Sequence, residues 1–193
     1  MSKKIVCIGD SNTWGYDPRS YAGEQYPPAV RWTARIDSSP AWEIISLAQN
    51  GRAIPQDGFS LRLLDLQLDA AAPFDGVCVM LGANDLLCGA PAQAAAAHMD
   101  TLLARLKRFG APVLLIAPPP FQSGTWVEGD QPIAASVQLA KLYRALAQDH
   151  GIAFADAGEW GIALAFDGVH FTEEGHLRFA EHAAQAFAQA SGA

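Results

Sequence analysis

The chain has few cysteines, a shortage of cations and no long apolar run. Its 193 residues include three cysteines, 13 lysines and arginines, and 20 aspartates and glutamates, and the net charge is −7. Three cysteines cannot all pair, so neither a disulfide framework nor an oxidising compartment is indicated. No basic stripe is present to replace the counterions of a phosphate backbone, so we expect no nucleic-acid partner.

Apolar stretches are also too short for a membrane. None approaches the roughly 18 residues that a spanning helix needs, so no membrane span is expected. The first apolar run stops at Gly9, which is too early for the hydrophobic region of a signal peptide. We therefore expect a cytoplasmic protein. No residues have the spacing of metal ligands, and we expect neither a metal nor a cofactor.

What the sequence does contain is an alternation of short apolar runs and amphipathic stretches. Short runs bounded by Gly, Pro or polar residues predict strands at 4–8, 43–47, 77–81, 113–117 and 152–155. Apolar residues at helical spacing predict helices around 61–68, at 91–109, at 132–149 and from 172–174 toward 190. This alternation predicts an α/β fold with a five-stranded parallel sheet between helices. The length and the absence of a linker predict one domain, residues 1–193.

Ser11 directly follows the first predicted strand, in Gly9-Asp10-Ser11. Ligands of an open parallel sheet bind at the carboxyl ends of its strands, so a serine here can act as a nucleophile. After the fifth strand, Asp167 and His170 stand three residues apart and can supply the orienting carboxylate and the general base. Each feature alone has a simpler explanation, because Gly-Asp-Ser and Asp-Gly are common in turns.

Two further residues follow the second and third predicted strands. The Asn84 amide can donate to a developing oxyanion, and the alternative is an Asx turn or a helix cap. Gly51 can present an unobstructed backbone N–H, and the alternative is a turn glycine with positive φ. All these residues are expected at one edge of the sheet. Independent turns would not be expected to bring a nucleophile, a base, an orienting carboxylate and two oxyanion donors together there.

This set resembles the SGNH hydrolases, also called the GDSL esterase and lipase family. The four residues that give the family its name match Ser11, Gly51, Asn84 and His170. The motif blocks match 9–13, 82–85 and 167–170 in the right order, although Asn12 stands where the shorter name has leucine. The segment 9–18, with Trp14 and Tyr16, is further similar to arylesterases and carbohydrate acetyl esterases.

The resemblance implies a three-layer α/β/α sandwich of flavodoxin-like architecture. It also implies a serine esterase that forms an acyl-enzyme on Ser11. In such an enzyme the oxyanion hole consists of the backbone N–H groups of Ser11 and Gly51 and the side chain of Asn84. No metal is implied. Asp10 and Asp85 lie beside the motifs and are expected to cap or brace loops, and His176, in the last predicted helix, is a poor candidate for the base.

The substrate is predicted from two long, aromatic loops at 13–30 and 118–131. Loops of this length are usually functional, and aromatic ones suit pocket walls or a contact in a homo-oligomer. We expect Trp14, Tyr16 and Trp126 to line an apolar pocket for a small-molecule ester with a small, acetyl-like acyl group.

Three alternatives remain open. The same site can transfer the acyl group to an alcohol if the aromatic pocket excludes water. The residues after the first strand, 11–13, can instead bind a phosphate or nucleotide in a flavodoxin-like module, which leaves Asn84, Asp167 and His170 without a role. The third alternative is an inactive scaffold, against which the intact residue set argues.

Overall fold

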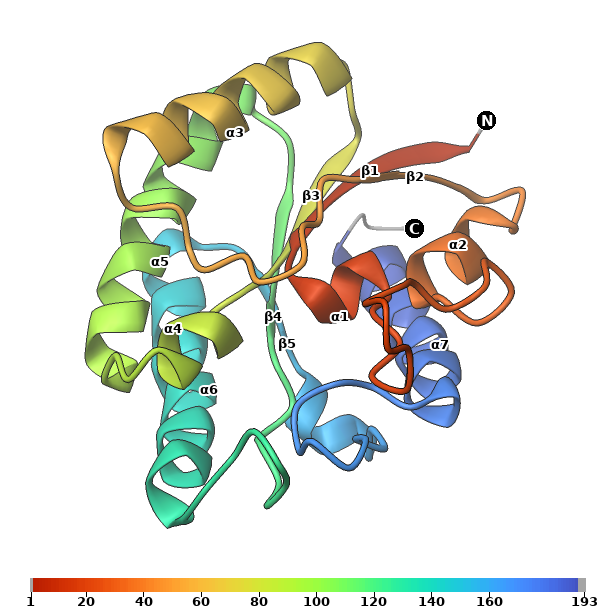
Figure 1. The fold of residues 1–193 in the computed structure, drawn as a ribbon. Helices are drawn as coiled ribbons and strands as arrows, with labels where there is room; N and C mark the ends of the chain where they lie inside the picture. The colour runs from red at the N-terminus through yellow and green to blue at the C-terminus, as the bar shows by residue number, and fades with distance from the viewer. Residues whose placement is uncertain (1, 191–193) are drawn as a thin grey trace.

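A computed structural model of the protein describes residues 2–190 (Figure 1). Five parallel strands form one sheet in the order β2-β1-β3-β4-β5. They are β1 (Lys3–Gly9), β2 (Trp42–Ser46), β3 (Gly76–Met80), β4 (Val113–Ala117) and β5 (Ala153–Asp156). All five predicted strands are therefore confirmed, and the order is that of flavodoxin-like sheets.

Helices cover both faces of the sheet, which gives the three-layer arrangement. One face carries α3 (Gly58–Ala71), α4 (Ala83–Leu87), α5 (Ala92–Leu106) and α6 (Asp130–His150) (Figure 1). The other carries α1 (Ser11–Trp14), α2 (Trp32–Asp37) and α7 (Glu173–Ala190). Two 3₁₀ turns, η1 (Lys107–Phe109) and η2 (Ala157–Trp160), follow α5 and β5.

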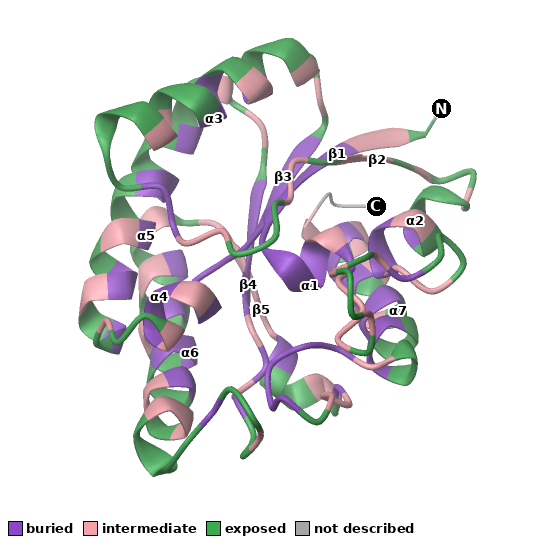
Figure 2. Cartoon of the chain, in the orientation of Figure 1, coloured by how far each residue is buried: buried purple, intermediate pink, exposed green. Residues whose placement is uncertain are grey.

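The strands supply two cores because successive residues point to opposite faces of a sheet. Val6, Val79 and Leu115 pack with residues of α3, α5 and α6. Cys7, Cys78 and the other alternate residues pack with residues of α2 and α7. Buried residues therefore run through the central strands (Figure 2). Cys7 and Cys78 are buried free thiols.

The sequence pattern did not predict the short helices α1 and α2. Helices of four and six residues show no apolar period, since the period becomes visible only over several turns. The predicted loop at 13–30 consequently begins inside α1, whose N-terminal cap is Asp10. This single turn of helix holds Ser11 at its first position, so the correction bears directly on the site.

The described residues have neither a membrane helix nor a metal cluster. Between positions 2 and 190, no helix has both the length and the apolar character that crossing a membrane requires. The same residues contain no group of three or more His, Cys, Asp or Glu side chains arranged to hold a metal ion.

Candidate active site

The segments that follow β1, β2, β3 and β5 meet at the carboxyl edge of the sheet. After β2, the Leu47 N–H donates to the Cys7 carbonyl at 2.9 Å and the Gln49 N–H donates to the Gly9 carbonyl at 3.2 Å. After β3, the Asn84 side chain donates to the Arg52 carbonyl at 3.0 Å. These bonds hold the segment that carries Gly51 between the ends of β1 and β3.

The segment after β1 places Ser11 at the first position of a helix. The Asp10 carboxylate accepts the Asn12 N–H at 3.0 Å and so caps α1. Ser11 is the first residue of α1, where a backbone N–H has no acceptor within the helix. Gly9 is required here, because a Cβ at this position would lie 2.1 Å from the Thr13 Oγ1.

Ser11, His170 and Asp167 form one continuous hydrogen-bonded series. The His170 Nε2 lies 3.0 Å from the Ser11 Oγ, and the His170 Nδ1 lies 2.7 Å from the Asp167 Oδ2. The other carboxylate oxygen of Asp167 accepts the backbone N–H groups of Val169 and His170, each at 2.9 Å. All three side chains are buried. The structure therefore brings together three residues that lie up to 159 positions apart in the sequence.

Asp167 is held in its ionised form. Burial raises the pKa of its carboxyl group, but the bonds from the His170 ring and from the two backbone N–H groups lower it. The net pKa lies below the usual value of 3.8. An ionised carboxylate at the Nδ1 of His170 fixes that nitrogen as the donor, and the Nε2 that faces Ser11 is then free to accept a proton.

Asn12 is a functional candidate that the sequence analysis missed. Its Nδ2 donates to the Val169 carbonyl at 3.1 Å, and its Oδ1 accepts the Phe171 N–H at 2.9 Å. The amide therefore holds the backbone on both sides of His170 against the segment that carries Ser11. The only signal in the sequence was the departure from leucine at this position, and a motif match assigns no contact to such a departure.

We expect Asn12→Leu to lower both stability and activity. Leucine has a similar volume, but it leaves a buried N–H and a buried carbonyl without partners, which costs about 1–3 kcal/mol each. A shift of His170 by about 1 Å would lower kcat by up to about 10²-fold. Urea denaturation and hydrolysis of p-nitrophenyl acetate measure the two effects. Gln185→Leu, which replaces an exposed amide on α7, is the control. Unchanged stability and kcat in Asn12→Leu would contradict this role.

Two of the three proposed oxyanion donors, Gly51 and Asn84, lie close to each other. Gly51 is exposed, has φ +73° and occupies the turn that the Arg52 N–H closes on the Gln49 carbonyl at 3.2 Å. Within residues 2–190 the Gly51 N–H has no hydrogen-bond acceptor. Asn84 does not cap α4, whose cap is Gly82. One amide hydrogen of Asn84 bonds to Arg52 and the second is available to another acceptor.

The neighbouring carboxylates brace the loops, as predicted. Asp85 accepts the Ile54 N–H at 3.0 Å and so supports the segment between β2 and α3. Burial raises the pKa of Asp85. Burial also raises the pKa of Asp10 to about 6; the Asn12 N–H and the charge of His170 oppose this rise, and the charge of Asp85 adds to it.

The raised pKa of Asp10 makes a specific prediction about stability. The folded protein holds this proton more tightly than the unfolded chain does, so the contribution of Asp10 to stability falls as pH rises from about 4 to about 6. Asp10→Asn keeps a good helix cap and cannot ionise. Its free energy of unfolding relative to the wild type should therefore rise by up to about 3 kcal/mol between pH 4 and pH 7.

Urea denaturation at the two pH values measures this difference. The control is Asp57→Asn, because Asp57 caps α3 on the surface and hydrogen bonds from Ser60 and Phe59 lower its pKa. Its relative stability should change with pH in the opposite direction. A pH-independent difference for Asp10→Asn would show that this carboxyl group titrates normally.

Two of the three proposed pocket residues contact His170. The ring centroids of Tyr16 and Trp126 lie 4.5 Å and 4.9 Å from that of the imidazole. Trp126 is 53% exposed, so one wall beside His170 is open to solvent. Trp14 is half-buried on α1, and its ring makes no aromatic contact with His170 among the described residues.

His176 is fully buried and has no contact with Ser11 among residues 2–190. Its ring packs edge-on against Tyr26 and Phe171, each at 5.3 Å between centroids. Burial lowers its pKa to about 3, so it is neutral at physiological pH. The prediction that His176 is a poor candidate for the base agrees with this placement.

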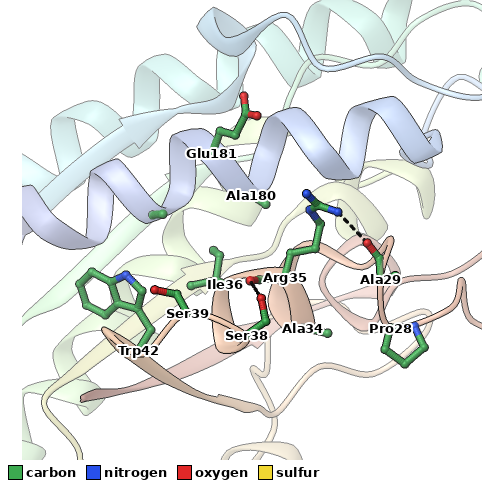
Figure 3. A pocket seen from close by; sticks show the side chains of 11 residues that line it. Pro28, Ala29, Ala34, Arg35, Ile36, Ser38, Ser39, Trp42, Ala180 and Glu181 are labelled. Carbon is green, nitrogen blue, oxygen red and sulfur yellow. Dashed lines mark hydrogen bonds between the residues drawn. The ribbon is translucent and has the colours of Figure 1, made fainter. Parts of the chain in front are cut away.

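Two of the cavities in the described part of the chain differ in their relation to the site. A cavity of about 580 Å³ lies between α2 and α7, and none of the proposed site residues lines it (Figure 3). A second, of about 340 Å³, is lined by Gln49, Arg52 and Phe59. The smaller cavity is the more relevant to chemistry, because Gln49 and Arg52 flank Gly51.

A parallel α/β sheet with a buried Ser–His–Asp series at its carboxyl edge has the arrangement used by serine hydrolases for acyl transfer. Sequence comparison agrees with this class. Residues 7–178 match the GDSL-like lipase/acylhydrolase family. The chain belongs to this family and is a carboxylic ester hydrolase. No curated protein sequence matches the chain.

Solved structures give the same result. The M. smegmatis aryl esterase superposes with a TM-score of 0.88 at 26% identity, over 98% of this chain and 100% of that chain. A carbohydrate acetylesterase from Sinorhizobium meliloti superposes with a TM-score of 0.86 at 27% identity, over 97% and 99%. A G-D-S-L family lipolytic protein from Veillonella parvula, at 20% identity and a TM-score of 0.77 over 96% and 98%, shares the fold.

Proposed function

We propose that the protein hydrolyses esters of small acyl groups through an acyl-enzyme on Ser11, with His170 and Asp167 completing a catalytic triad. The observation that carries the proposal is the geometry of the series, with 3.0 Å between the Ser11 Oγ and the His170 Nε2 and 2.7 Å between the His170 Nδ1 and Asp167. Both distances lie within the range that proton transfer to a base requires.

The mechanism follows from these positions. The His170 Nε2 takes the Ser11 proton as the Oγ attacks the ester carbonyl, and ionised Asp167 stabilises the imidazolium that forms. The Ser11 N–H, the Gly51 N–H and the second amide hydrogen of Asn84 stabilise the oxyanion. His170 then gives its proton to the leaving alcohol. Water, activated by His170, hydrolyses the acyl-enzyme and regenerates Ser11.

The preference for small acyl groups rests on the walls of the site. Tyr16 and Trp126 each pack against the ring of the base, and we expect these aromatic walls to restrict the length of an acyl chain beside His170. The likeness to an aryl esterase and to a carbohydrate acetylesterase supports an acetyl-like acyl group on an aromatic or sugar alcohol. Trp14 is proposed to line the same pocket from α1.

A series of p-nitrophenyl esters tests the acyl preference. We expect kcat/KM to be highest for the acetate and to fall by about 10-fold or more for the butyrate, the scale for additional methylenes in a restrictive pocket. Trp126→Ala should reduce this discrimination, while Tyr21→Ala, which removes a fully exposed aromatic from the loop between α1 and α2, should not. Equal turnover of acetyl and octanoyl esters would refute the preference.

A further inference from the structure

Arg52 follows Gly51 in the segment between β2 and α3, and its side chain turns back on that segment. The Nη1 of Arg52 donates to the Leu47 carbonyl at the start of the segment, and the Nη2 donates to the Gln67 Oε1 of α3 at 3.4 Å. Arg52 is half-buried. It therefore connects the start of the segment that presents Gly51 to the body of α3.

The backbone of the same residue contacts the other proposed oxyanion donor. The Arg52 carbonyl accepts the Asn84 Nδ2 at 3.0 Å, and the Arg52 N–H closes the turn around Gly51. Asn84 lies on α4, beyond β3, and Gly51 lies beyond β2. Arg52 therefore links the position of the Gly51 N–H to the position of the Asn84 amide.

The tip of the turn needs such support because the bonds of the Gln49 N–H to Gly9 and of the Ile54 N–H to Asp85 hold only the residues on either side of it. Gln49, Asn50 and Gly51 are exposed, and a Cβ at Gly51 would meet no atom within 4 Å. An exposed glycine in a turn has large conformational freedom. Oxyanion donors act only when they are already aligned with the position that the charge will occupy, so motion here would reduce their effect.

We propose that Arg52 is a positioning residue that fixes the Gly51 N–H and the Asn84 amide relative to each other. This inference rests on the proposed role of those two groups as oxyanion donors. Arg52 touches neither the reacting carbonyl nor Ser11 in this arrangement. It acts by keeping the turn closed, through its guanidinium on Leu47 and Gln67, and by orienting Asn84 through its carbonyl.

Kinetics of Arg52→Met and Arg52→Lys with p-nitrophenyl acetate test the inference. Methionine keeps an unbranched, flexible side chain but cannot donate, and kcat should fall by up to about 10²-fold while KM changes by less than about threefold. Lysine keeps the charge and can donate to Leu47, but it cannot replace both guanidinium contacts. Its kcat should lie between those of the wild type and Arg52→Met, and it tests the inference even where the methionine variant does not fold.

A double-mutant cycle with Asn84→Ala separates positioning from general stability. Asn84→Ala alone should lower kcat by about 10²–10³-fold. In the double variant Arg52→Met/Asn84→Ala the loss should be smaller than the product of the single losses, because an absent donor cannot be misaligned. Arg35→Met is the matched control, since the Arg35 guanidinium donates to the Ala29 carbonyl at 2.8 Å away from the site (Figure 3). It should keep the wild-type kcat.

The outcomes distinguish this inference from the proposed function. An unchanged kcat in Asn84→Ala would remove Asn84 from the oxyanion hole and would overturn the role of Arg52 with it. A large loss in Asn84→Ala together with wild-type kcat in both Arg52 variants would overturn the Arg52 inference alone. Losses that multiply independently in the double variant would also overturn it.

Discussion

Replacement of Ser11 by alanine is expected to lower kcat for ester hydrolysis by about 10⁶-fold, the scale for loss of a serine nucleophile. Only the hydroxyl that lies 3.0 Å from the His170 Nε2 is removed, so the fold and the oxyanion donors should persist. His170→Ala should cause a similar loss. The double variant should be no worse than either single one, because the two residues act as one unit.

Steady-state hydrolysis of p-nitrophenyl acetate measures this loss, and thermal unfolding checks that the variant is folded. Ser38→Ala is the control, since the Ser38 hydroxyl bonds to the Arg35 carbonyl on the surface, away from the Ser–His–Asp series. A folded Ser11→Ala variant that keeps more than about a tenth of the wild-type kcat would be incompatible with a nucleophilic Ser11, given the scale of the expected loss.

Asp167→Asn is expected to lower kcat by about 10⁴-fold, although it changes only one atom of the side chain. The Asp167 Oδ1 accepts the Val169 and His170 N–H groups, so the asparagine oxygen must stay at that position. Its NH₂ group then faces the His170 Nδ1. The ring responds by accepting at Nδ1 and carrying its proton on Nε2, where it can no longer take the proton of Ser11.

Asp156→Asn is the matched control for this substitution. The Asp156 carboxylate also accepts a backbone N–H two residues on, from Gly158 at 2.9 Å, but it has no contact with His170 in the described chain. We expect Asp156→Asn to keep kcat within a few-fold of the wild-type value. An Asp167→Asn variant with comparable activity would mean that the tautomer of His170 does not depend on Asp167.

The sheet was predictable because its signal is local and repeated. Continuously apolar runs such as 113–117 occur where both faces of a strand are covered, and β4 has these bounds in the structure. The short helices α1 and α2 were missed, since one or two turns show no period. The aromatic residues in and between these helices gave no further signal, because their packing depends on distant parts of the chain.

The site was predictable to the extent that topology determines it. Ser11, Asn84 and His170 follow strands of one parallel sheet, and the sheet places such residues at one edge. The roles of Asn12 and Arg52 were not predictable in this way. Asn12 bonds to backbone atoms of Val169 and Phe171, 157 and 159 positions away, and Arg52 bonds to the nearby Leu47 carbonyl. No residue type at those positions signals the contact.

The central claim is that the acyl group passes through a covalent bond to Ser11. Acid quenching of the reaction with p-nitrophenyl acetate within the first turnover, followed by peptide mass spectrometry, tests it directly. We predict an acetyl group on the peptide that contains Ser11 in the wild-type protein, and none on that peptide in Ser11→Ala. Ester turnover at the wild-type rate with no acyl group on Ser11 at any quench time, or with the group on another residue, would contradict the account.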